Sequence, residues 1–103
     1  MTTIAERVAR GAALLDEQLP GWADHIDLGE LALESPCRCI LGQLWQGKDP
    51  EEPYEMALGE LNLDYGEDDA AGFDKMPGTG NWGEYAQLTG AWRELIESRR
   101  AAS

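Results

Sequence analysis

Two cysteines and one histidine are the side chains in this sequence that could bind a metal ion or act as nucleophiles. Cys37 and Cys39 are separated by a single residue, and His25 is the only histidine. Paired zinc-binding cysteines are normally spaced more widely and need further ligands. A relaxed disulfide across so short a loop is also disfavoured. The spacing predicts two free thiols packed in a helix. The alternative is a small metal-binding or hydrolytic protein that uses Cys37, Cys39 and His25.

Motifs for other enzyme chemistries do not occur in the sequence. It contains no nucleophile elbow, no phosphate-binding loop with its lysine and no dinucleotide-binding fingerprint. The glycines at 78 and 80 precede a predicted helix and could receive an anion, but the acidic surroundings and the lack of that lysine indicate a loop. The acidic residues at 64–69 lack the spacing of a calcium-binding loop. We therefore expect no catalytic residue, no cofactor and no bound metal, and an enzyme is the less favoured class.

Acidity is the strongest feature of the composition. The 103 residues include 20 Asp and Glu against 8 Lys and Arg, which gives a formal net charge of −12 at pH 7. A nucleic acid duplex or an anionic membrane surface would repel such a chain, so we expect neither to be bound directly. Many of the acids fall in one stretch that contains no Lys or Arg, and they are Glu51, Glu52, Glu55, Glu60, Asp64, Glu67, Asp68 and Asp69.

This acidic stretch has two interpretations. It can be a solvated surface that keeps the protein soluble. It can also be an anionic face that attracts a basic protein and, with its carboxylates fixed on a fold, mimics a nucleic acid backbone. Nearby aromatic residues could anchor a partner, although each also suits core packing, and they are Trp45, Tyr54, Tyr65 and Trp82. The second interpretation predicts the partner-binding residues Glu51, Glu52, Tyr54, Glu55, Glu60, Asp64, Tyr65, Glu67, Asp68, Asp69 and Trp82.

The elements that position these residues are predicted to be helices. Apolar residues with helical spacing predict three main helices at about 3–19, 35–46 and 81–100. Thr3 and Glu6 fit a capping box, Ser35 suits an N-cap, and Asn81 precedes the last helix. Short helices in 51–72 and an irregular 20–34 segment complete a compact, mostly α single domain that spans 1–103.

The predicted core combines the apolar faces of these helices. Gly11 interrupts the first helix and weakens it by about 1 kcal/mol relative to alanine, unless close packing requires a glycine there. The core residues we expect are Ile4, Val8, Leu15, Ile40, Leu41, Leu44, Leu58, Leu88, Trp92, Leu95 and Ile96.

Nothing in the sequence indicates export or membrane insertion. The first residues lack a basic region followed by an apolar stretch, and the uncharged stretches are too short to span a bilayer. We therefore expect a cytoplasmic protein with reduced cysteines and no contact with a membrane.

Several short stretches occur in an order that resembles a known group of proteins. The stretches lie at 12–16, 20–22, 26–28, 39–44, 72–74 and 92–96, and they read AALLD, PGW, IDL, CILGQL, GFD and WRELI. Across most of the chain they resemble a group of small uncharacterised proteins of actinobacteria and their bacteriophages. The resemblance carries over no catalytic residue. It implies a phage or prophage accessory protein, located in the host cytoplasm if phage-encoded.

The leading expectation is a non-enzymatic acidic protein-interaction module with a basic protein partner. Its specific form would be a phage-encoded modulator, or a nucleic-acid-mimic inhibitor, of a host protein. Two alternatives remain open. One is the metal-binding or hydrolytic protein described above, and the other is a structural subunit of a homo-oligomer with tryptophans at the interface.

Overall fold

The protein is built from helices that pack around a shared hydrophobic core. The computed structural model describes residues 3–35, 38–48, 51–63, 71–73 and 82–102. The helices in these residues are α1 (Ile4–Gln18), the 3-10 helix η1 (Trp22–His25), α2 (Ile40–Trp45), α3 (Pro53–Glu60) and α4 (Trp82–Ala102). The described residues contain no strand, so the predicted mostly α fold is confirmed.

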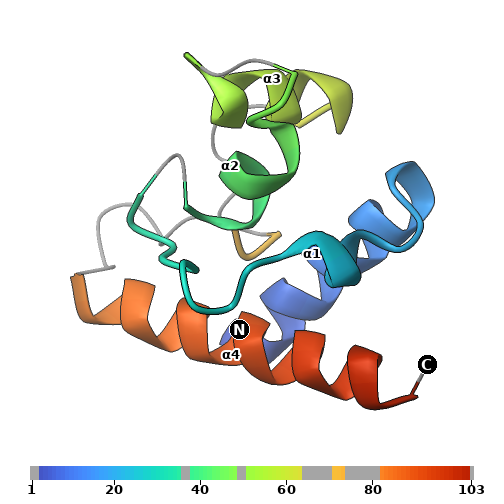
Figure 1. Ribbon diagram of the computed structural model, residues 1–103. Coiled ribbons are helices and arrows are strands. Elements are labelled where there is room, and N and C mark those ends of the chain that lie inside the picture. The colour runs from blue at the N-terminus through green and yellow to red at the C-terminus, as the bar shows by residue number, and fades with distance from the viewer. Residues whose placement is uncertain (1–2, 36–37, 49–50, 64–70, 74–81, 103) are drawn as a thin grey trace.

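Two helix pairs form the opposite ends of the molecule. α1 packs across α4 at one end, α2 packs on α3 at the other, and η1 contacts both α4 and α2 (Figure 1). The Cα radius of gyration is 12.5 Å, close to the value of about 13 Å expected of a folded domain of this length. No helix in the described part of the chain has both the length and the apolar character needed to cross a membrane.

The first predicted helix agrees with the structure at both ends. The Thr3 hydroxyl oxygen accepts a hydrogen bond from the Glu6 backbone N–H at 3.1 Å, and the hydroxyl donates to the Glu6 carboxylate at 3.2 Å. At the other end, the Leu19 backbone N–H donates to the Leu15 carbonyl at 2.7 Å. The expected irregular segment at 20–34 is also confirmed, since it contains only η1 and turns.

The second predicted helix is much shorter than the 35–46 expected from the sequence. It begins at Ile40, and its N-cap is Cys39 instead of Ser35. Cys39 has an extended backbone, with φ −71° and ψ 176°, and its sulfur accepts a hydrogen bond from the Gly42 N–H at 3.3 Å. Ser35 instead closes a turn, because its carbonyl accepts from the N–H groups of Arg38 and Cys39. Burial of Cys39 thus fixes the chain in a non-helical turn before α2.

The short helix predicted within 51–72 is present as α3. Pro53 occupies its first turn, where a missing N–H costs no hydrogen bond. The chain then leaves the helix through Asn62, which has a positive φ of 62°. The rest of the predicted 51–72 region falls largely outside the described residues, which resume at 71. The last helix starts at Trp82 and extends to Ala102, and its predicted N-cap Asn81 also lies outside the described residues.

The core includes most of the predicted residues and several that the helical pattern did not include. The predicted core residues Ile4, Leu44 and Leu95 are partly buried and pack against the core. The predicted residues that are fully buried are Val8, Leu15, Ile40, Leu41, Leu58, Leu88, Trp92 and Ile96. The larger buried hydrophobic residues from outside the predicted core are Trp22, Ile26, Leu31, Leu33, Trp45, Leu61 and Phe73.

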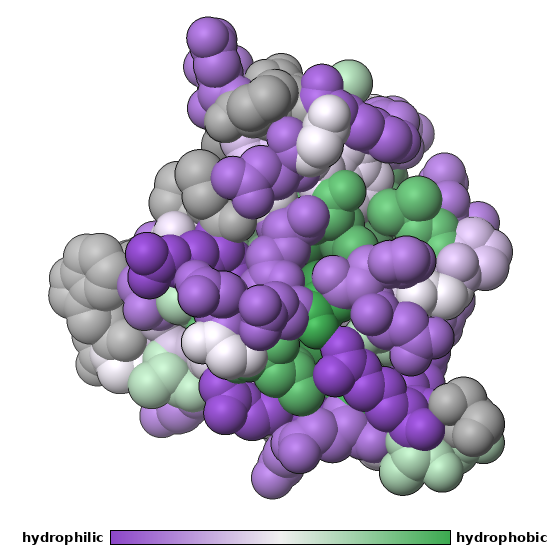
Figure 2. Space-filling view, viewed as in Figure 1, coloured by the Kyte–Doolittle hydropathy of each residue, from purple (hydrophilic) through white to green (hydrophobic). Residues whose placement is uncertain are grey.

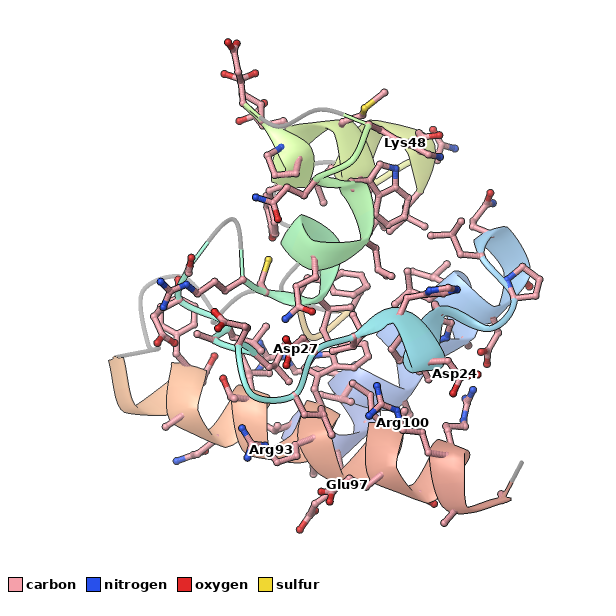
Figure 3. The ribbon with its side chains drawn as sticks, viewed as in Figure 1. Asp24, Asp27, Lys48, Arg93, Glu97 and Arg100 are labelled. Atoms are coloured by element: carbon pink, nitrogen blue, oxygen red, sulfur yellow. The ribbon has the colours of Figure 1, made fainter. Side chains whose placement is uncertain are left out.

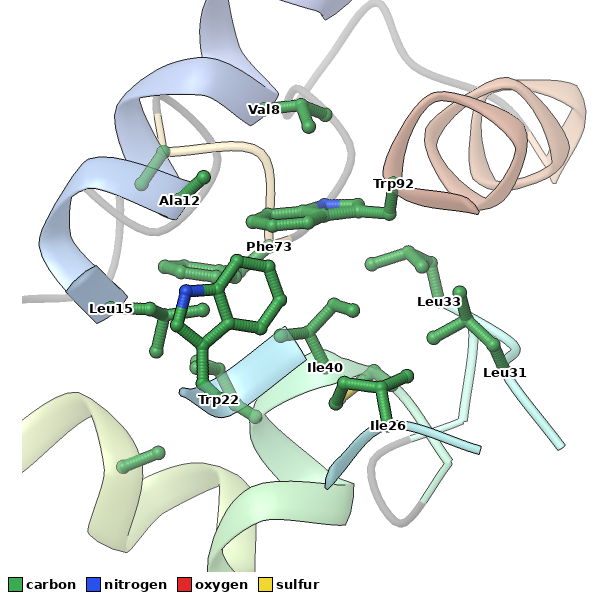
Figure 4. Packing of buried hydrophobic residues seen from close by; sticks show 14 of the residues in the cluster. Val8, Ala12, Leu15, Trp22, Ile26, Leu31, Leu33, Ile40, Phe73 and Trp92 are labelled. Carbon is green, nitrogen blue, oxygen red and sulfur yellow. The ribbon is translucent and has the colours of Figure 1, made fainter. Parts of the chain in front are cut away.

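Trp92 of α4 lies at the centre of this core (Figure 4). Its ring stacks on Phe73 with centroids 5.5 Å apart, and it meets Trp22 edge to face at 5.7 Å. Its buried indole N–H donates to the Gly72 carbonyl at 2.7 Å. The aromatic contacts fill the volume between α1 and α4, and the hydrogen bond satisfies the one polar atom of the ring.

Two glycines allow the 71–73 segment to approach α1 closely. A Cβ at Gly11 would overlap the Ala71 carbonyl oxygen and lie 3.0 Å from the Trp92 ring. Gly72 has a φ of +78°, and a Cβ there would lie 2.9 Å from the Val8 backbone. Close packing therefore requires Gly11, in spite of its low helix propensity.

Arginines of α4 connect that helix to the irregular segment and to α1. Arg93 donates to the Leu28 carbonyl at 3.1 Å, and Arg100 donates to the carbonyls of Ala23 and Ile26. Arg93 and Arg100 point from α4 toward this segment, whereas Glu97 points away from it (Figure 3). These bonds give partners to carbonyl groups that no regular element of the segment would satisfy.

Asp16 joins α1, η1 and α4 through one carboxylate. It accepts two hydrogen bonds from the Arg99 guanidinium, at 2.8 and 2.9 Å, and one from the Trp22 indole N–H at 2.9 Å. The hydrogen bond from Arg99, which outweighs the opposing effect of burial, lowers the pKa of the Asp16 carboxyl below its ordinary value of 3.8.

We expect Gly11→Ala to lower the free energy of unfolding by about 1–3 kcal/mol, because the added methyl group overpacks the core. Gly90→Ala in α4 is the matched control, because a Cβ there meets nothing within 4 Å. This control should be neutral or stabilise the protein by up to about 1 kcal/mol, as expected of alanine in an exposed helix. Urea unfolding of both variants tests the prediction, which an unchanged Gly11→Ala stability would contradict.

Asp16→Asn should lower the free energy of unfolding at pH 7 by about 1 kcal/mol, because the ion pair with Arg99 is partly exposed. A carboxyl with a lowered pKa stabilises the fold fully above its unfolded pKa and loses this contribution as the pH falls through its folded pKa. The difference between wild type and variant should therefore shrink below about pH 3.8. Urea unfolding at several pH values measures it. Glu17→Gln, which neutralises an exposed neighbour in the same helix, should show no comparable loss at pH 7.

Candidate functional site

The candidate site is the acidic outer face of α3, defined here as Glu51, Glu52, Glu55, Met56 and Glu60. All of these residues are exposed. α3 lies at the end of the molecule farthest from α4 (Figure 1), and its buried face, formed by Ala57 and Leu58, is directed into the fold. A helix with one buried and one acidic face presents its carboxylates together, because residues three and four apart share a face. The structure therefore brings the first half of the predicted acidic stretch onto one surface.

Several predicted site residues cannot be placed on this surface. Asp64, Tyr65, Glu67, Asp68 and Asp69 lie outside the described residues. Trp82 is the first residue of α4, and its side chain is likewise outside the described part of the structure.

Glu60 differs from the other acids because it takes part in a contact between α2 and α3. Its carboxylate accepts a hydrogen bond from the Trp45 indole N–H, and the Lys48 ammonium lies 3.5 Å from its other oxygen. The Lys48 ammonium also lies 5.8 Å from the centroid of the Trp45 ring. The charge of Glu60 is thus partly neutralised by a lysine that precedes the acidic stretch in sequence.

Two of the aromatic residues near the acidic stretch, Trp45 and Tyr54, have described side chains, and they differ in burial. Trp45 is 1% exposed and belongs to the core, in agreement with the core-packing interpretation and not with a role as a partner anchor. Tyr54 is half-buried and packs against the core from α3. Trp45 can be buried in the core because its ring is large and apolar and because its indole N–H donates to the Glu60 carboxylate.

Met56 is not among the site residues predicted from the sequence. It is 38% exposed, and among the described residues it is the large hydrophobic residue that lies exposed at the surface. The signal was present in the sequence, since Tyr54, Ala57, Leu58 and Leu61 define the apolar face of α3 and Met56 lies outside that pattern. Methionine is flexible and polarisable, and it is common on binding surfaces that adapt to a partner.

The alternative site at the cysteines and the histidine does not assemble in the described residues. Cys39 is buried and caps α2, whereas His25 is exposed at the end of η1. Cys37 lies outside the described residues. Among the residues that the structure describes, no group of three or more His, Cys, Asp or Glu side chains could coordinate a metal ion.

We expect Glu60→Ala to lower the free energy of unfolding by about 1 kcal/mol, because it leaves the Trp45 indole N–H without its protein partner. Lys48→Ala removes only an exposed ion pair and a cation–π contact, so its effect should be smaller. Thermal and urea unfolding of both variants test this order. Equal losses in the two variants would show that the ion pair, and not the indole hydrogen bond, stabilises the contact.

Comparison with known proteins adds no relative from which a role could be transferred. No protein-family model, curated protein or solved structure matches this chain.

Proposed function

We propose that this protein is a non-enzymatic interaction module whose acidic α3 face binds a basic region of another protein. The observation that carries the proposal is the concentration of exposed carboxylates on α3 around one exposed methionine. A face of this kind attracts a basic partner over a distance and adds an apolar contact once the two surfaces meet.

The distribution of positive charge supports this choice of surface. Most described cations are engaged within the fold and lie away from α3. Arg7 pairs with Glu84 at 3.3 Å, Arg99 pairs with Asp16, and Arg93 and Arg100 bind backbone carbonyls. Near α3, the described part of the chain has only Lys48, which is paired with Glu60. The α3 face therefore carries the exposed acids Glu51, Glu52 and Glu55 and is negatively charged.

The predicted partner is a protein of the host cell, and a phage-encoded modulator is the specific role we propose for the chain. A mimic of a nucleic acid backbone is a narrower form of the same proposal. In that form the α3 carboxylates would occupy a basic groove that otherwise binds phosphates, so the complex would compete with nucleic acid for the partner.

A charge-matched pair of variants tests the proposal. Glu52→Gln/Glu55→Gln neutralises two acids of α3, and Glu94→Gln/Glu97→Gln neutralises two exposed acids of α4, so both variants have the same net charge. The wild-type protein, immobilised, should retain a basic host protein at low salt and release it as the salt concentration rises, because the Debye length falls to about 10 Å at 0.1 M. The α3 variant should retain much less of it, whereas the α4 variant should behave like wild type.

Two results would contradict the proposal. Equal losses in the two variants would mean that net charge, and not the α3 face, controls association. Retention that does not change with salt would mean that the contact is not electrostatic. Met56→Gln tests the apolar contact separately, and it should increase dissociation of the complex without changing the salt dependence of its formation.

A further inference from the structure

A polar hollow lies on a different part of the molecule from the α3 face. It has a volume of about 360 Å³ and is lined by His25, Asp27, Glu30, Arg38, Gln43 and Gln46. These residues come from three segments, namely the end of η1 with the turn that follows it, the turn before α2, and α2 itself. The volume falls within the range of about 300–1,000 Å³ that small-molecule sites occupy.

Gln43 fixes the walls of this hollow relative to each other. Its side-chain oxygen accepts from the Asp27 N–H at 2.7 Å, and its amide nitrogen donates to the carbonyls of Asp27 and Arg38, at 3.2 and 2.9 Å. The Asp27 carboxylate is fixed in turn by the Gly29 N–H at 2.9 Å. The protein backbone around the hollow is therefore already ordered, so binding of a ligand does not have to order it.

The charged side chains of the hollow have unused hydrogen-bonding capacity. Arg38 Nε lies 3.8 Å from Glu30 Oε2, and the two side chains are 64% and 61% exposed. An ion pair this long and this exposed contributes little to the stability of the fold, so a ligand can replace it. The second oxygen of the Asp27 carboxylate, the His25 imidazole and the Gln46 amide have no hydrogen bond within the described residues.

We propose that this hollow binds a free, polar α-amino acid. The ligand carboxylate would take the place of Glu30 at the Arg38 guanidinium, and the ligand ammonium would then bind the carboxylates of Glu30 and Asp27. This exchange breaks the one ion pair between Arg38 and Glu30 and forms a new charge pair at each wall, whereas a ligand with a single charge can pair with one wall only. A polar side chain on the ligand would reach His25 and Gln46. The site is independent of the proposed partner surface on α3.

Titration of the isotope-labelled protein with L-glutamine, followed by two-dimensional amide NMR, tests this proposal. Saturable shifts should occur at the amides of the residues that line the hollow. Methylammonium and acetate, which each carry one of the two charges, should bind at least about fivefold more weakly, equivalent to the loss of about 1 kcal/mol from one exposed charge pair.

Variants of the two charged walls complete the test. Arg38→Gln and Glu30→Gln should each weaken L-glutamine binding about fivefold, because each removes one charge pair. Arg10→Gln is the control, since Arg10 is an exposed arginine of α1 that does not line the hollow. Binding of methylammonium as tight as that of L-glutamine would overturn the proposal and show a simple cation site. Absence of saturable shifts, or equal weakening by Arg10→Gln, would also overturn it.

Discussion

The packing of Trp92 is the constraint on which the rest of the structure depends. Its ring contacts side chains from two distant segments, Phe73 and Trp22, and its N–H binds the Gly72 carbonyl. These contacts require the 71–73 segment to enter the space between α1 and α4, and Gly11 and Gly72 make that approach possible. A small domain has a small core, so one aromatic cluster in it determines how the two longest helices, α1 and α4, are placed.

Regular helices could be predicted from the sequence because their signals are local. The capping residues and apolar spacing of α1 gave both of its ends, and the same spacing gave most of α4. The start of α2 could not be predicted in this way. Ser35 is the better N-cap by propensity, but burial of Cys39 and its bond to Gly42 moved the helix start to Ile40. The need for Gly11 was equally non-local, because it depends on Ala71, which is distant in sequence.

The candidate site was predicted only in part for a related reason. Acidic residues on α3 could be identified from composition and helical spacing. The roles of Glu60 and Trp45 could not, since their hydrogen bond joins α3 to α2 and depends on how the two helices pack. The hollow near Gln43 combines side chains from three segments, so no single motif describes it. Contacts between residues that are distant in sequence were therefore the main feature that sequence patterns could not predict.

The position of α3 has a consequence for how this protein can change over evolutionary time. Helix α3 packs mainly on α2, and it lies at the opposite end of the molecule from α4, the helix that carries Trp92. Exposed substitutions on α3 other than at Glu60 therefore leave the packing between helices intact, and surface changes of this kind usually alter stability by less than about 0.5 kcal/mol. Hydrophilic residues cover much of the face seen in Figure 2, around a hydrophobic strip, and they are similarly tolerant of exchange. A lineage of such proteins could diversify the α3 surface, and with it any partner preference, while retaining one scaffold.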